Sequence, residues 1–355
     1  MSEAEKAATV RVDHAALREF CADVLIAEGV PEDDARIVAD SLVEANLRGV
    51  DSHGVIRLSM YVERMQKGGN RRTTDLTEVQ GTSGLTVLDA HNGLGQVASH
   101  KAMQLAIARA RETGLAAVGV RNSSHFGMAA YYSMLALEHD MIGLALSNTN
   151  VNMTTSTSAK PGVANNPWSA TIPAGQELPV VIDMASSIVA AGKLMNAIAK
   201  GEKVPLGWGV DADGRLTDDP AKIFYGGSLL PFGGYKGYAI ALLIDVLCGV
   251  LTGSGFGHEV SSPTKDRAKP TRAGHFFLAL DLKAVGDPAD FKARMDRMIA
   301  DLHALTPAEG VDRVRVPGEL EFEAHRERTA NGIPLPQAIW EDLRRTGAAH
   351  GIEWR

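Results

Sequence analysis

The hydrophobic pattern of the chain changes near residue 70, and this change limits the folds that the chain can adopt. Before that point, apolar residues recur at helical spacing in residues 12–28, 31–47 and 53–66, and Gly29 and Gly68 follow the ends of two of these segments. After it, short apolar strands alternate with helices. Such alternation is typical of an α/β domain, so we expect a helical layer joined to an α/β sheet.

The strands and helices expected after residue 70 extend to the C-terminus. Strands are expected at residues 85–89, 115–120, 142–147, 179–183 and 274–281. Helices are expected at residues 96–113, 186–200, 237–251, 291–305 and 334–346, and the apolar run 237–251 is expected to be a buried helix. A chain of 355 residues has room for two domains. We therefore predict a helical domain of residues 1–70, completed by 320–355, and an α/β cofactor-binding and catalytic domain of residues 71–319.

Composition excludes several classes of function. The formal net charge of -7 argues against nucleic acid and anionic membranes as main partners. The two cysteines, Cys21 and Cys248, provide neither a disulfide framework nor a cysteine-based zinc site. Residues 1–11 are charged and lack the apolar core of a secretory signal, and the apolar run 237–251 contains Asp245 and is too short to span a membrane. We therefore expect a cytoplasmic enzyme.

Two histidine-containing motifs indicate the chemistry. Their sequences are Asp51-Ser52-His53-Gly54-Val55-Ile56-Arg57 and Asn122-Ser123-Ser124-His125-Phe126-Gly127. Histidine titrates near neutral pH and can therefore donate or accept a proton where most side chains cannot. Arg57 lies one helical turn after His53 and can hold a carboxylate through two hydrogen bonds. The two motifs together predict an enzyme that moves a proton on a small carboxylic acid.

A glycine-rich turn after the strand at 85–89 imitates a dinucleotide-binding sequence. Residues 93–98 have the spacing G-x-G-x-x-A, which lets a backbone approach a pyrophosphate at a helix N-terminus. However, residues 89–92 are long for the tight turn of a Rossmann fold, and the next strand ends in Arg121 instead of an acid. An arginine at that place is also compatible with a 2′-phosphate. We expect the glycines to mark an ordinary turn between strand and helix.

Six motifs in order, from Asp51 to Glu319, resemble those of the malate/L-lactate dehydrogenase-type oxidoreductases. This family includes ureidoglycolate and sulfolactate dehydrogenases, diketogulonate reductase and cyclic-imine carboxylate reductases. The motifs are Asp51-Ser52-His53-Gly54-x-x-Arg57, residues 122–127, Lys160-Pro161-Gly162 with Asn166-Pro167, Ile182-Asp183-Met184-Ala185, Gly233-Gly234-Tyr235-Lys236-Gly237 and Val316-Pro317-Gly318-Glu319. The resemblance implies an α/β fold with a non-Rossmann, mixed-sheet cofactor domain, and a homodimer.

The resemblance also implies roles for individual residues. The catalytic residues are His53, His125, Ser52 and Arg57, and it stays open which histidine donates the proton. The substrate-binding residues are Arg57, Tyr61, Lys160 and Asn166. The cofactor-binding residues are Ser147, Asp183, Met184, Ala185, Lys236, Gly237, Pro317, Gly318 and Glu319, and no metal is expected. A lysine in a glycine-rich turn suits a pyrophosphate, because the backbone can approach closely and the charge is complementary. His258 and His275 have glycine neighbours, which by themselves assign no role.

We therefore predict an oxidoreductase that uses NAD(H) or NADP(H) and transfers a hydride between nicotinamide and a small 2-hydroxy or 2-oxo acid, similar to malate or lactate. A first alternative is a reductase of cyclic-imine carboxylates such as piperideine- or pyrroline-2-carboxylate. A second is a metal-dependent hydrolase with His53, His125 and Asp51 as ligands, although the sequence has no His-x-His or His-x-x-x-His pair. A third is a nucleotide-binding regulator, which the intact pair of histidines with Arg57 opposes. Ser124 and Asn165 depart from the residues most frequent in the family, so the substrate stays open, as does the choice between NAD(H) and NADP(H).

Overall fold

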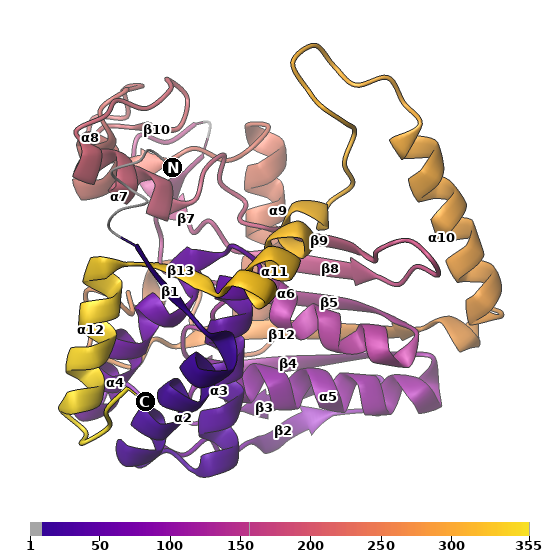
Figure 1. The fold of residues 1–355 in the computed structure, drawn as a ribbon, viewed down its shortest axis with the longest axis horizontal. Helices are drawn as coiled ribbons and strands as arrows, with labels where there is room; N and C mark the ends of the chain where they lie inside the picture. Colours follow the sequence, from indigo (N-terminus) through magenta and orange to yellow (C-terminus); the bar gives the residue numbers. More distant parts are fainter. Residues whose placement is uncertain (1–8, 156, 355) are drawn as a thin grey trace.

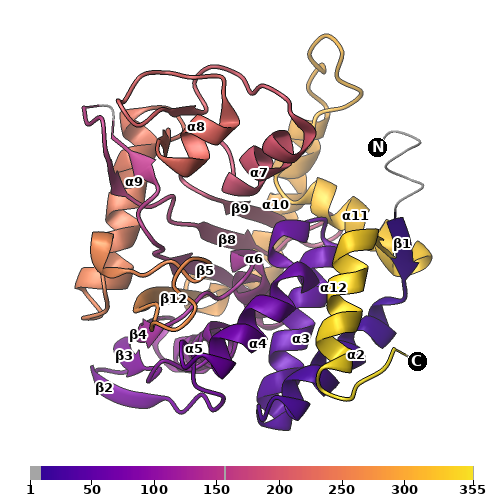
Figure 2. The same ribbon diagram turned by 90° about the vertical axis from the view of Figure 1, so that its left-hand side faces the viewer.

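The computed structural model describes residues 9–155 and 157–354 and has three parts: a helical layer, a mixed sheet and a smaller lobe (Figures 1 and 2). The strands are β1 Thr9–Val12, β2 Thr77–Gly81, β3 Leu85–Asp89, β4 Leu115–Ser123, β5 Met141–Ser147, β6 Met153–Thr154, β7 Pro161–Val163, β8 Trp168–Ile172, β9 Val180–Met184, β10 Gly209–Val210, β11 Ser228–Leu229, β12 Ala273–Asp281 and β13 Ile333–Pro336. The helices are α2 His14–Ala27, α3 Glu32–Leu47, α4 Leu58–Gln66, α5 Gly95–Thr113, α6 Ala129–Ser133, α7 Ala191–Lys200, α8 Pro220–Tyr225, α9 Tyr235–Asp245, α10 Pro288–His303, α11 Glu319–Asn331 and α12 Gln337–Ala348. Most of the segment analysed for a secretory signal, residues 1–8, lies outside the described residues.

The main sheet contains seven strands in the order β2-β3-β4-β12-β5-β8-β9. Among these strands, β3 and β4 are parallel neighbours, and the other neighbouring pairs are antiparallel. As a result, β3, β4, β5 and β9 run in the same direction and their carboxyl ends share one edge of the sheet. The mixed sheet confirms the predicted non-Rossmann α/β fold class, since a Rossmann sheet is mostly parallel.

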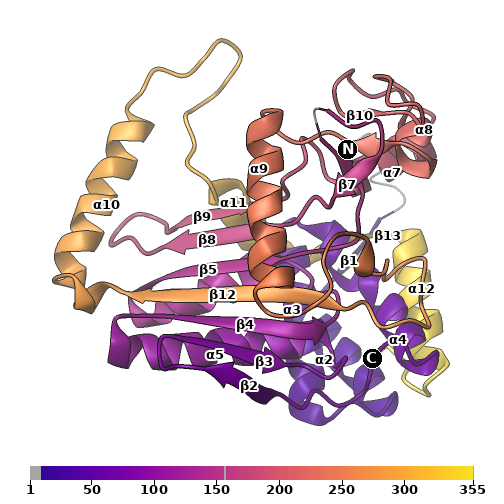
Figure 3. The same cartoon turned by 180° about the vertical axis from the view of Figure 1, so that it is seen from behind.

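Helices cover the two faces of this sheet unequally. Helices α5 and α6 lie on one face, and α9 lies across the other (Figures 1 and 3). The inner side of α5 is apolar and fully buried, with residues such as Ala102, Met103 and Ile107 packed against the sheet. On the face that carries α9, Ala117 and Phe276 of the sheet pack against Ile244 and Cys248 in a smaller apolar cluster.

The helical layer brings together the two ends of the described chain (Figure 2). Helices α2, α3, α4 and α12 surround one apolar core, and Leu17, Leu42 and Leu58 meet Ile333 and Leu343 there. Strands β1 and β13 pair antiparallel beside it. The buried carboxylate of Glu28 accepts hydrogen bonds from Gln66 (2.8 Å), Arg72 (2.5 Å) and His350 (2.8 Å). These bonds compensate the desolvation of the carboxylate and fix the C-terminal segment to the layer.

The smaller lobe consists of a four-stranded sheet in the order β10-β11-β6-β7 together with α7 and α8. It has an apolar cluster of its own, which includes Met153, Leu194, Ile223 and Leu229. The sequence motifs did not reveal this lobe, because its strands have only two or three residues each and are too short to show a period. The division into two domains stays a prediction.

Several expected elements differ from those observed. The segment 237–251, expected to be buried, forms α9 and a π-helical turn, Val246–Val250, and its Leu242, Leu243 and Val250 are 44%, 56% and 57% exposed. An apolar run alone cannot distinguish a helix covered by its own chain from one with an open apolar side. The segment 53–66 begins with two 3-10 turns because the extended backbone of Gly54 interrupts it. The helix expected at 186–200 starts only at Ala191.

No helix within residues 9–155 and 157–354 is both long and apolar enough to cross a membrane. The cytoplasmic location stays a prediction.

Candidate active site

The candidate site lies where the helical layer, the carboxyl edge of the main sheet and the smaller lobe meet. The first histidine motif comes from the connection between α3 and α4, and the second follows β4. At Gly192, near the start of α7, an added Cβ would lie 3.6 Å from the Cβ of Ser52, so the smaller lobe borders the first motif. Residues that are far apart in the sequence are therefore brought together by the topology.

The first histidine motif is held by residues of two helices. Asn46, in α3, donates to the Asp51 carboxylate at 2.6 Å and accepts the backbone N–H of Val55 at 2.8 Å. Arg328, in α11, pairs with the same carboxylate at 2.6 Å. A Cβ at Gly54 would lie 2.1 Å from Oδ1 of Asn46, so only glycine permits this close approach. Asp51 therefore anchors the loop, because its carboxylate is bonded to both Asn46 and Arg328.

The second histidine motif rests on the N-terminus of α5. The backbone N–H of Gly95 donates to Oγ of Ser124 at 3.1 Å. A Cβ at Gly95 would lie 2.3 Å and 2.6 Å from the carbonyl oxygens of Ser124 and His125. The glycine turn that imitates a dinucleotide-binding sequence thus holds the loop of His125. Arg121, the residue that a 2′-phosphate would need, donates instead to Asp89 at 2.8 Å.

The two imidazoles face each other across the site. The rings of His53 and His125 are stacked, with centroids 5.5 Å apart and an interplanar angle of 15°. Burial, assisted by the positive charge of Arg57, lowers the pKa of His53 to about 4. Burial and the neighbouring His53 and Arg57 also lower the pKa of His125 well below its usual range. Both rings are therefore neutral at pH 7 and can accept a proton.

Hydrogen bonds orient both imidazoles. Oγ of Ser52 lies 2.9 Å from Nδ1 of His53. The hydroxyl of Tyr61 lies 2.7 Å from Nδ1 of His125, and burial raises the pKa of this phenol above its usual range. Tyr61 therefore keeps its proton at neutral pH, and when it donates this proton to Nδ1, the Nε2 atom of His125 carries the ring hydrogen. Tyr61, predicted to bind substrate, thus contacts His125, one of the two predicted catalytic histidines.

Arg57 provides the cation of the site. Its Nε donates to the backbone carbonyl of Ser52 at 2.7 Å, which fixes the guanidinium beside the two imidazoles. Since this bond uses only Nε, the two terminal nitrogens can form the paired hydrogen bonds that a carboxylate accepts. This arrangement is compatible with the predicted role of Arg57 in substrate binding.

The other two predicted substrate-binding residues are engaged elsewhere. Nζ of the exposed Lys160 donates to the carbonyl of Ala212 at 2.7 Å, within the smaller lobe. Asn166 is fully buried; it accepts the backbone N–H of Thr149 at 3.1 Å and donates to the carbonyl of Ala241 at 2.8 Å. These bonds connect the segment after β5, the segment before β8 and helix α9. A role of either residue in substrate binding stays a prediction.

Three of the predicted cofactor-binding residues, Asp183, Met184 and Ala185, lie at the end of β9. The carboxylate of Asp183 accepts the backbone N–H of Ala130 at 3.1 Å. Desolvation by the surrounding protein atoms and the negative charge of Glu321 raise the pKa of Asp183 to about 7, although its side chain is still exposed to solvent. Met184 is 41% exposed, and Ala185 is half-buried.

Two other predicted segments pack against β9, one after its end and one near its start. Gly237 approaches the backbone of the loop that follows Ala185, because its Cβ would lie 3.1 Å from the carbonyl oxygen of Ser186. Lys236 beside it is exposed at the start of α9. Pro317 accepts the N–H of Val181 at 3.0 Å, and a Cβ at Gly318 would lie 2.9 Å from Val181. An exposed cation in a glycine-rich turn at a helix start suits a pyrophosphate, and cofactor binding by Lys236 stays a prediction.

Two of the predicted cofactor residues point into the protein. The carboxylate of Glu319 is buried and lies 2.5 Å from Nε2 of His303. Ser147 is buried; its hydroxyl donates to the carbonyl of Asn148 at 3.0 Å and lies 2.9 Å from Nδ1 of His275. Both residues shape the walls of the candidate site, and direct contact with a cofactor stays a prediction.

The geometry does not support the metal-dependent hydrolase. The carboxylate of Asp51, which that hypothesis needs as a ligand, is paired with Arg328 and Asn46. Among residues 9–155 and 157–354, no three His, Cys, Asp or Glu side chains are placed to hold a metal ion.

Sequence patterns alone did not identify three residues that support the site. Asn46 and Arg328 hold the first motif, and His275 lies beneath the second. His275 and Asn46 are isolated polar residues within apolar stretches, and such a residue signals a buried polar contact without naming its partner. Arg328 lies in a helix rich in charges, and that pattern does not single it out.

Comparison with known proteins decides the family. A sequence model of the malate/L-lactate dehydrogenase family matches residues 12–344. The chain belongs to this family. It is therefore an oxidoreductase of small acids, as the six motifs predict.

The similarity to individual members extends over nearly the whole chain. A malate dehydrogenase from Pyrococcus abyssi is 35% identical over 351 residues, which is 97% of this chain and 96% of that protein. A ureidoglycolate dehydrogenase (NAD⁺) from Escherichia coli O157:H7 is 30% identical, over 94% and 95%. A (2R)-3-sulfolactate dehydrogenase (NADP⁺) from Chromohalobacter salexigens is 34% identical, over 90% and 93%.

Solved structures agree with this assignment. The malate dehydrogenase of Pyrococcus horikoshii OT3 superimposes with a TM-score of 0.90 at 32% identity, covering 98% of this chain and 97% of that one. A delta1-piperideine-2-carboxylate reductase from Pseudomonas syringae pvar. tomato superimposes with a TM-score of 0.86 at 27% identity, covering 95% and 100%. The fold therefore accommodates dehydrogenases and an imine reductase.

Proposed function

We propose that this protein transfers a hydride between a nicotinamide cofactor, NAD(H) or NADP(H), and the carbon that carries the oxygen of a small 2-hydroxy or 2-oxo acid. The observation that supports this most directly is the pair of neutral imidazoles, 5.5 Å apart, beside Arg57. The carboxylate of the acid pairs with the terminal nitrogens of Arg57, which places the adjacent hydroxyl or carbonyl near the imidazoles. The names of the dehydrogenases above, with NAD⁺ in one and NADP⁺ in another, support both cofactors.

Neutral imidazoles suit the oxidation of the hydroxy acid. One imidazole accepts the hydroxyl proton while the C–H bond breaks. The hydrogen of that bond leaves with both bonding electrons as a hydride, and the C–O bond becomes a carbonyl. The bound nicotinamide supplies the hydride acceptor in this direction and the donor in the other. In the reverse direction, the same imidazole returns the proton to the oxygen, and the hydroxyl of Ser52 orients the ring of His53.

A substrate panel tests this proposal. The purified protein is offered oxaloacetate, pyruvate, sulfopyruvate and delta1-piperideine-2-carboxylate, each with NADH and with NADPH, and absorbance at the nicotinamide band is followed. We expect at least one 2-oxo acid to be reduced with a higher kcat/KM than the imine. Reduction of the imine alone would establish the alternative, which the likeness to the piperideine-2-carboxylate reductase favours. Absence of turnover with all acids and both cofactors would overturn the proposal.

Arg57 gives a second test of the substrate class. Lysine cannot form the two parallel hydrogen bonds of a guanidinium, so Arg57→Lys is expected to raise KM for the acid about tenfold or more, with little change in cofactor Kd. Arg36→Lys, at an exposed arginine on the surface of the helical layer, is the matched control. An unchanged KM for every acid of the panel would contradict the carboxylate contact.

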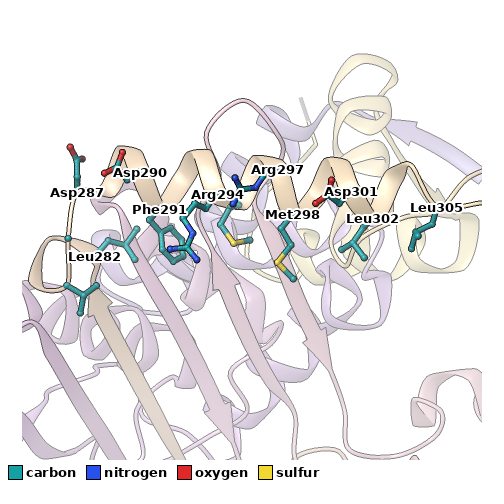
Figure 4. A pocket seen from close by; sticks show the side chains of 13 residues that line it. Leu282, Asp287, Asp290, Phe291, Arg294, Arg297, Met298, Asp301, Leu302 and Leu305 are labelled. Carbon is teal, nitrogen blue, oxygen red and sulfur yellow. The ribbon is translucent and has the colours of Figure 1, made fainter.

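We further propose that two copies of the chain associate into a homodimer. Two uncovered apolar surfaces support this. The first is the outer side of α9 and the π-helical turn, where Leu243, Val246 and Val250 are between 42% and 57% exposed. The second is a groove of about 860 Å³ along α10 (Figure 4), where Phe291, Met298 and Leu302 extend from the helix toward the sheet. Contiguous apolar surface of this kind usually marks an interface.

Hydrodynamic measurements test the homodimer. Sedimentation equilibrium is expected to give about twice the 37.8 kDa of one chain, and Leu243→Glu is expected to shift the protein toward the monomer, since a charge at the centre of an apolar interface is strongly unfavourable. Leu216→Glu alters a leucine of the smaller lobe that is 61% exposed and serves as control. A monomeric wild type at micromolar concentration would contradict the homodimer.

A further inference from the structure

His275 occupies a central place beneath the candidate site. It lies in β12, between β4 and β5, and none of its surface is exposed. In the ladder between β12 and β4, Ala273 faces Ser123 and His275 faces Val120, so β4 contains one extra residue there. Within this bulge, Asn122 adopts a left-handed backbone with φ of 51°. Bulges change the direction in which a side chain points, and this bulge lets Ser123 reach the ring of His275.

Both nitrogens of His275 contact serine hydroxyls on the neighbouring strands. Nδ1 lies 2.9 Å from Oγ of Ser147, at the end of β5. Nε2 lies 2.9 Å from Oγ of Ser123, at the end of β4. In a neutral imidazole one nitrogen donates and the other accepts, and a hydroxyl can serve either one, so both nitrogens are satisfied. A histidine that only filled space would not need two polar partners.

The ring of His275 also supports the loop of the second histidine motif. It stacks on Phe126 with centroids 4.8 Å apart and an interplanar angle of 3°. Phe126 directly follows His125, and Ser123 precedes it by two residues. The loop that carries His125 is therefore held by His275 from both sides of His125, once by a hydrogen bond and once by an aromatic contact.

We propose that His275 is a positioning residue that acts in two directions. Through Nε2 and its ring face it fixes the loop of His125, and through Nδ1 it fixes Ser147 on the side where the cofactor is expected. This inference rests on the proposed function. Its consequence is that the proton-transfer side and the cofactor side of the site share one support. Since a displacement of about 1 Å can cost about 10²-fold in rate, such a support affects turnover without touching the substrate.

Two substitutions separate the two directions. The amide of asparagine reaches the position of Nδ1, and the longer side chain of glutamine reaches that of Nε2. His275→Asn therefore keeps the contact with Ser147 and loses that with Ser123, whereas His275→Gln does the reverse. We expect the Asn variant to show the lower kcat and the Gln variant to show the weaker cofactor binding, each by about threefold to tenfold relative to the other, as expected for the loss of one hydrogen bond.

The measurements distinguish positioning from a packing role. The kcat is measured on the best acid of the panel, and the cofactor Kd by quenching of protein fluorescence. In addition, NMR of histidine labelled with ¹⁵N gives the pKa of His125 in the ligand-free protein. We expect this pKa to rise toward its ordinary value in the Asn variant, because a looser loop lets water reach the ring. The Gln variant is expected to show a smaller rise.

Control variants show whether the effects are specific to His275. His258→Asn and His258→Gln make the same changes at an exposed histidine. Should the His275 variants fail to fold, Ser123→Ala and Ser147→Ala remove the two contacts one at a time with little change in volume. Equal kcat, equal Kd and an unchanged His125 pKa in all variants, with lower thermal stability alone, would overturn the inference. The NMR measurement needs neither substrate nor cofactor, so a wild type without turnover refutes the proposed function and leaves this test intact.

Discussion

Two glycine-rich turns of this protein have similar sequences and different surroundings. Each lies at the start of a helix: Gly93 to Gly95 leads into α5, and the turn from Gly233 to Gly237 includes the first residues of α9. At the first turn, Gly95 lies against the loop of His125, so that an added Cβ would collide with two carbonyl oxygens. At the second, Gly234 has open space around its Cβ position, and Lys236 beside it is exposed.

From this difference we expect a glycine-rich turn before a helix to bind an anion only where no other loop of the protein covers the helix start. The N-terminus of α5 is occupied by the hydroxyl of Ser124, so its positive potential serves the protein's own loop. At the N-terminus of α9, the backbone N–H groups of Lys236 and Gly237 donate to carbonyls of the preceding turn, and the side chain of Lys236 is exposed. We therefore predict that the first turn supports proton transfer and that the second binds the cofactor.

The largest effect is expected from the imidazoles, one of which the first turn supports. His53→Ala and His125→Ala are each expected to lower kcat by about 10²-fold or more, because general acid–base catalysis typically contributes that much. Cofactor Kd is expected to change little, since the cofactor is assigned to the other turn. Stopped-flow turnover and fluorescence titration measure the two quantities.

The two histidine variants also resolve the open question of roles. The variant with the greater loss of kcat identifies the histidine that transfers the proton. Should either variant lose cofactor affinity while keeping a kcat near that of wild type, the assignment of the first turn to proton transfer would be wrong.

A smaller effect is expected from the glycine of the first turn. Gly95→Ala places a Cβ 2.3 Å from the carbonyl oxygen of Ser124, so backbone must move, and overpacking of this kind typically costs about 1–3 kcal/mol. We expect a lower free energy of unfolding in urea and a lower kcat, with cofactor Kd nearly unchanged. Gly84→Ala is the matched control, since its Cβ meets no atom within 4 Å. Selective loss of cofactor affinity in Gly95→Ala would restore the Rossmann interpretation.

A still smaller effect is expected at the second turn. Lys236→Ala is expected to weaken cofactor binding about fivefold, on the order of 1 kcal/mol, because one exposed charge contact with a phosphate is lost. The difference from wild type is expected to shrink at 0.5 M salt, where exposed charges are screened. Isothermal titration calorimetry at two salt concentrations measures it, with Lys222→Ala as the control. Equal affinities of wild type and Lys236→Ala at low salt would remove the second turn from the cofactor site.

The smallest effect concerns pH and His275, the histidine beneath the loop of His125. Burial lowers the pKa of His275 to about 3 in the folded state, against about 6.5 for an ordinary histidine. The unfolded chain therefore takes up the proton first, so this group reduces stability as pH falls below about 6.5 and has little effect above it. Between pH 7 and pH 6, wild type is expected to lose on the order of 0.5 kcal/mol more than His275→Phe. Urea unfolding at both pH values measures this, and identical losses would show that His275 is not neutral in the folded protein.

The parts of the structure that follow from local pattern were predictable. Helices α2, α3 and α5 and strands β3, β5 and β12 lie within a few residues of their expected positions, because their apolar residues repeat over enough turns or pleats to set a period. The strands of the smaller lobe were not, since two or three residues carry no period. The exposed side of α9 was also missed, because hydrophobicity indicates that a surface will be covered and does not indicate by what.

The candidate site, too, has features that were predictable from the sequence and features that were not. The sequence by itself determined the residue types that the site contains. A histidine after a serine, an arginine four residues later and a lysine in a glycine-rich turn favour proton transfer, carboxylate binding and phosphate binding. Only the tertiary structure decided which of them meet. Tyr61 lies 64 residues from His125 and contacts it at 2.7 Å, and His275 reaches Ser123 across 152 residues. The physical reason is that local pattern fixes helices and strands, whereas the order of strands in the sheet and the packing of the helical layer on its edge determine which strand ends share a site.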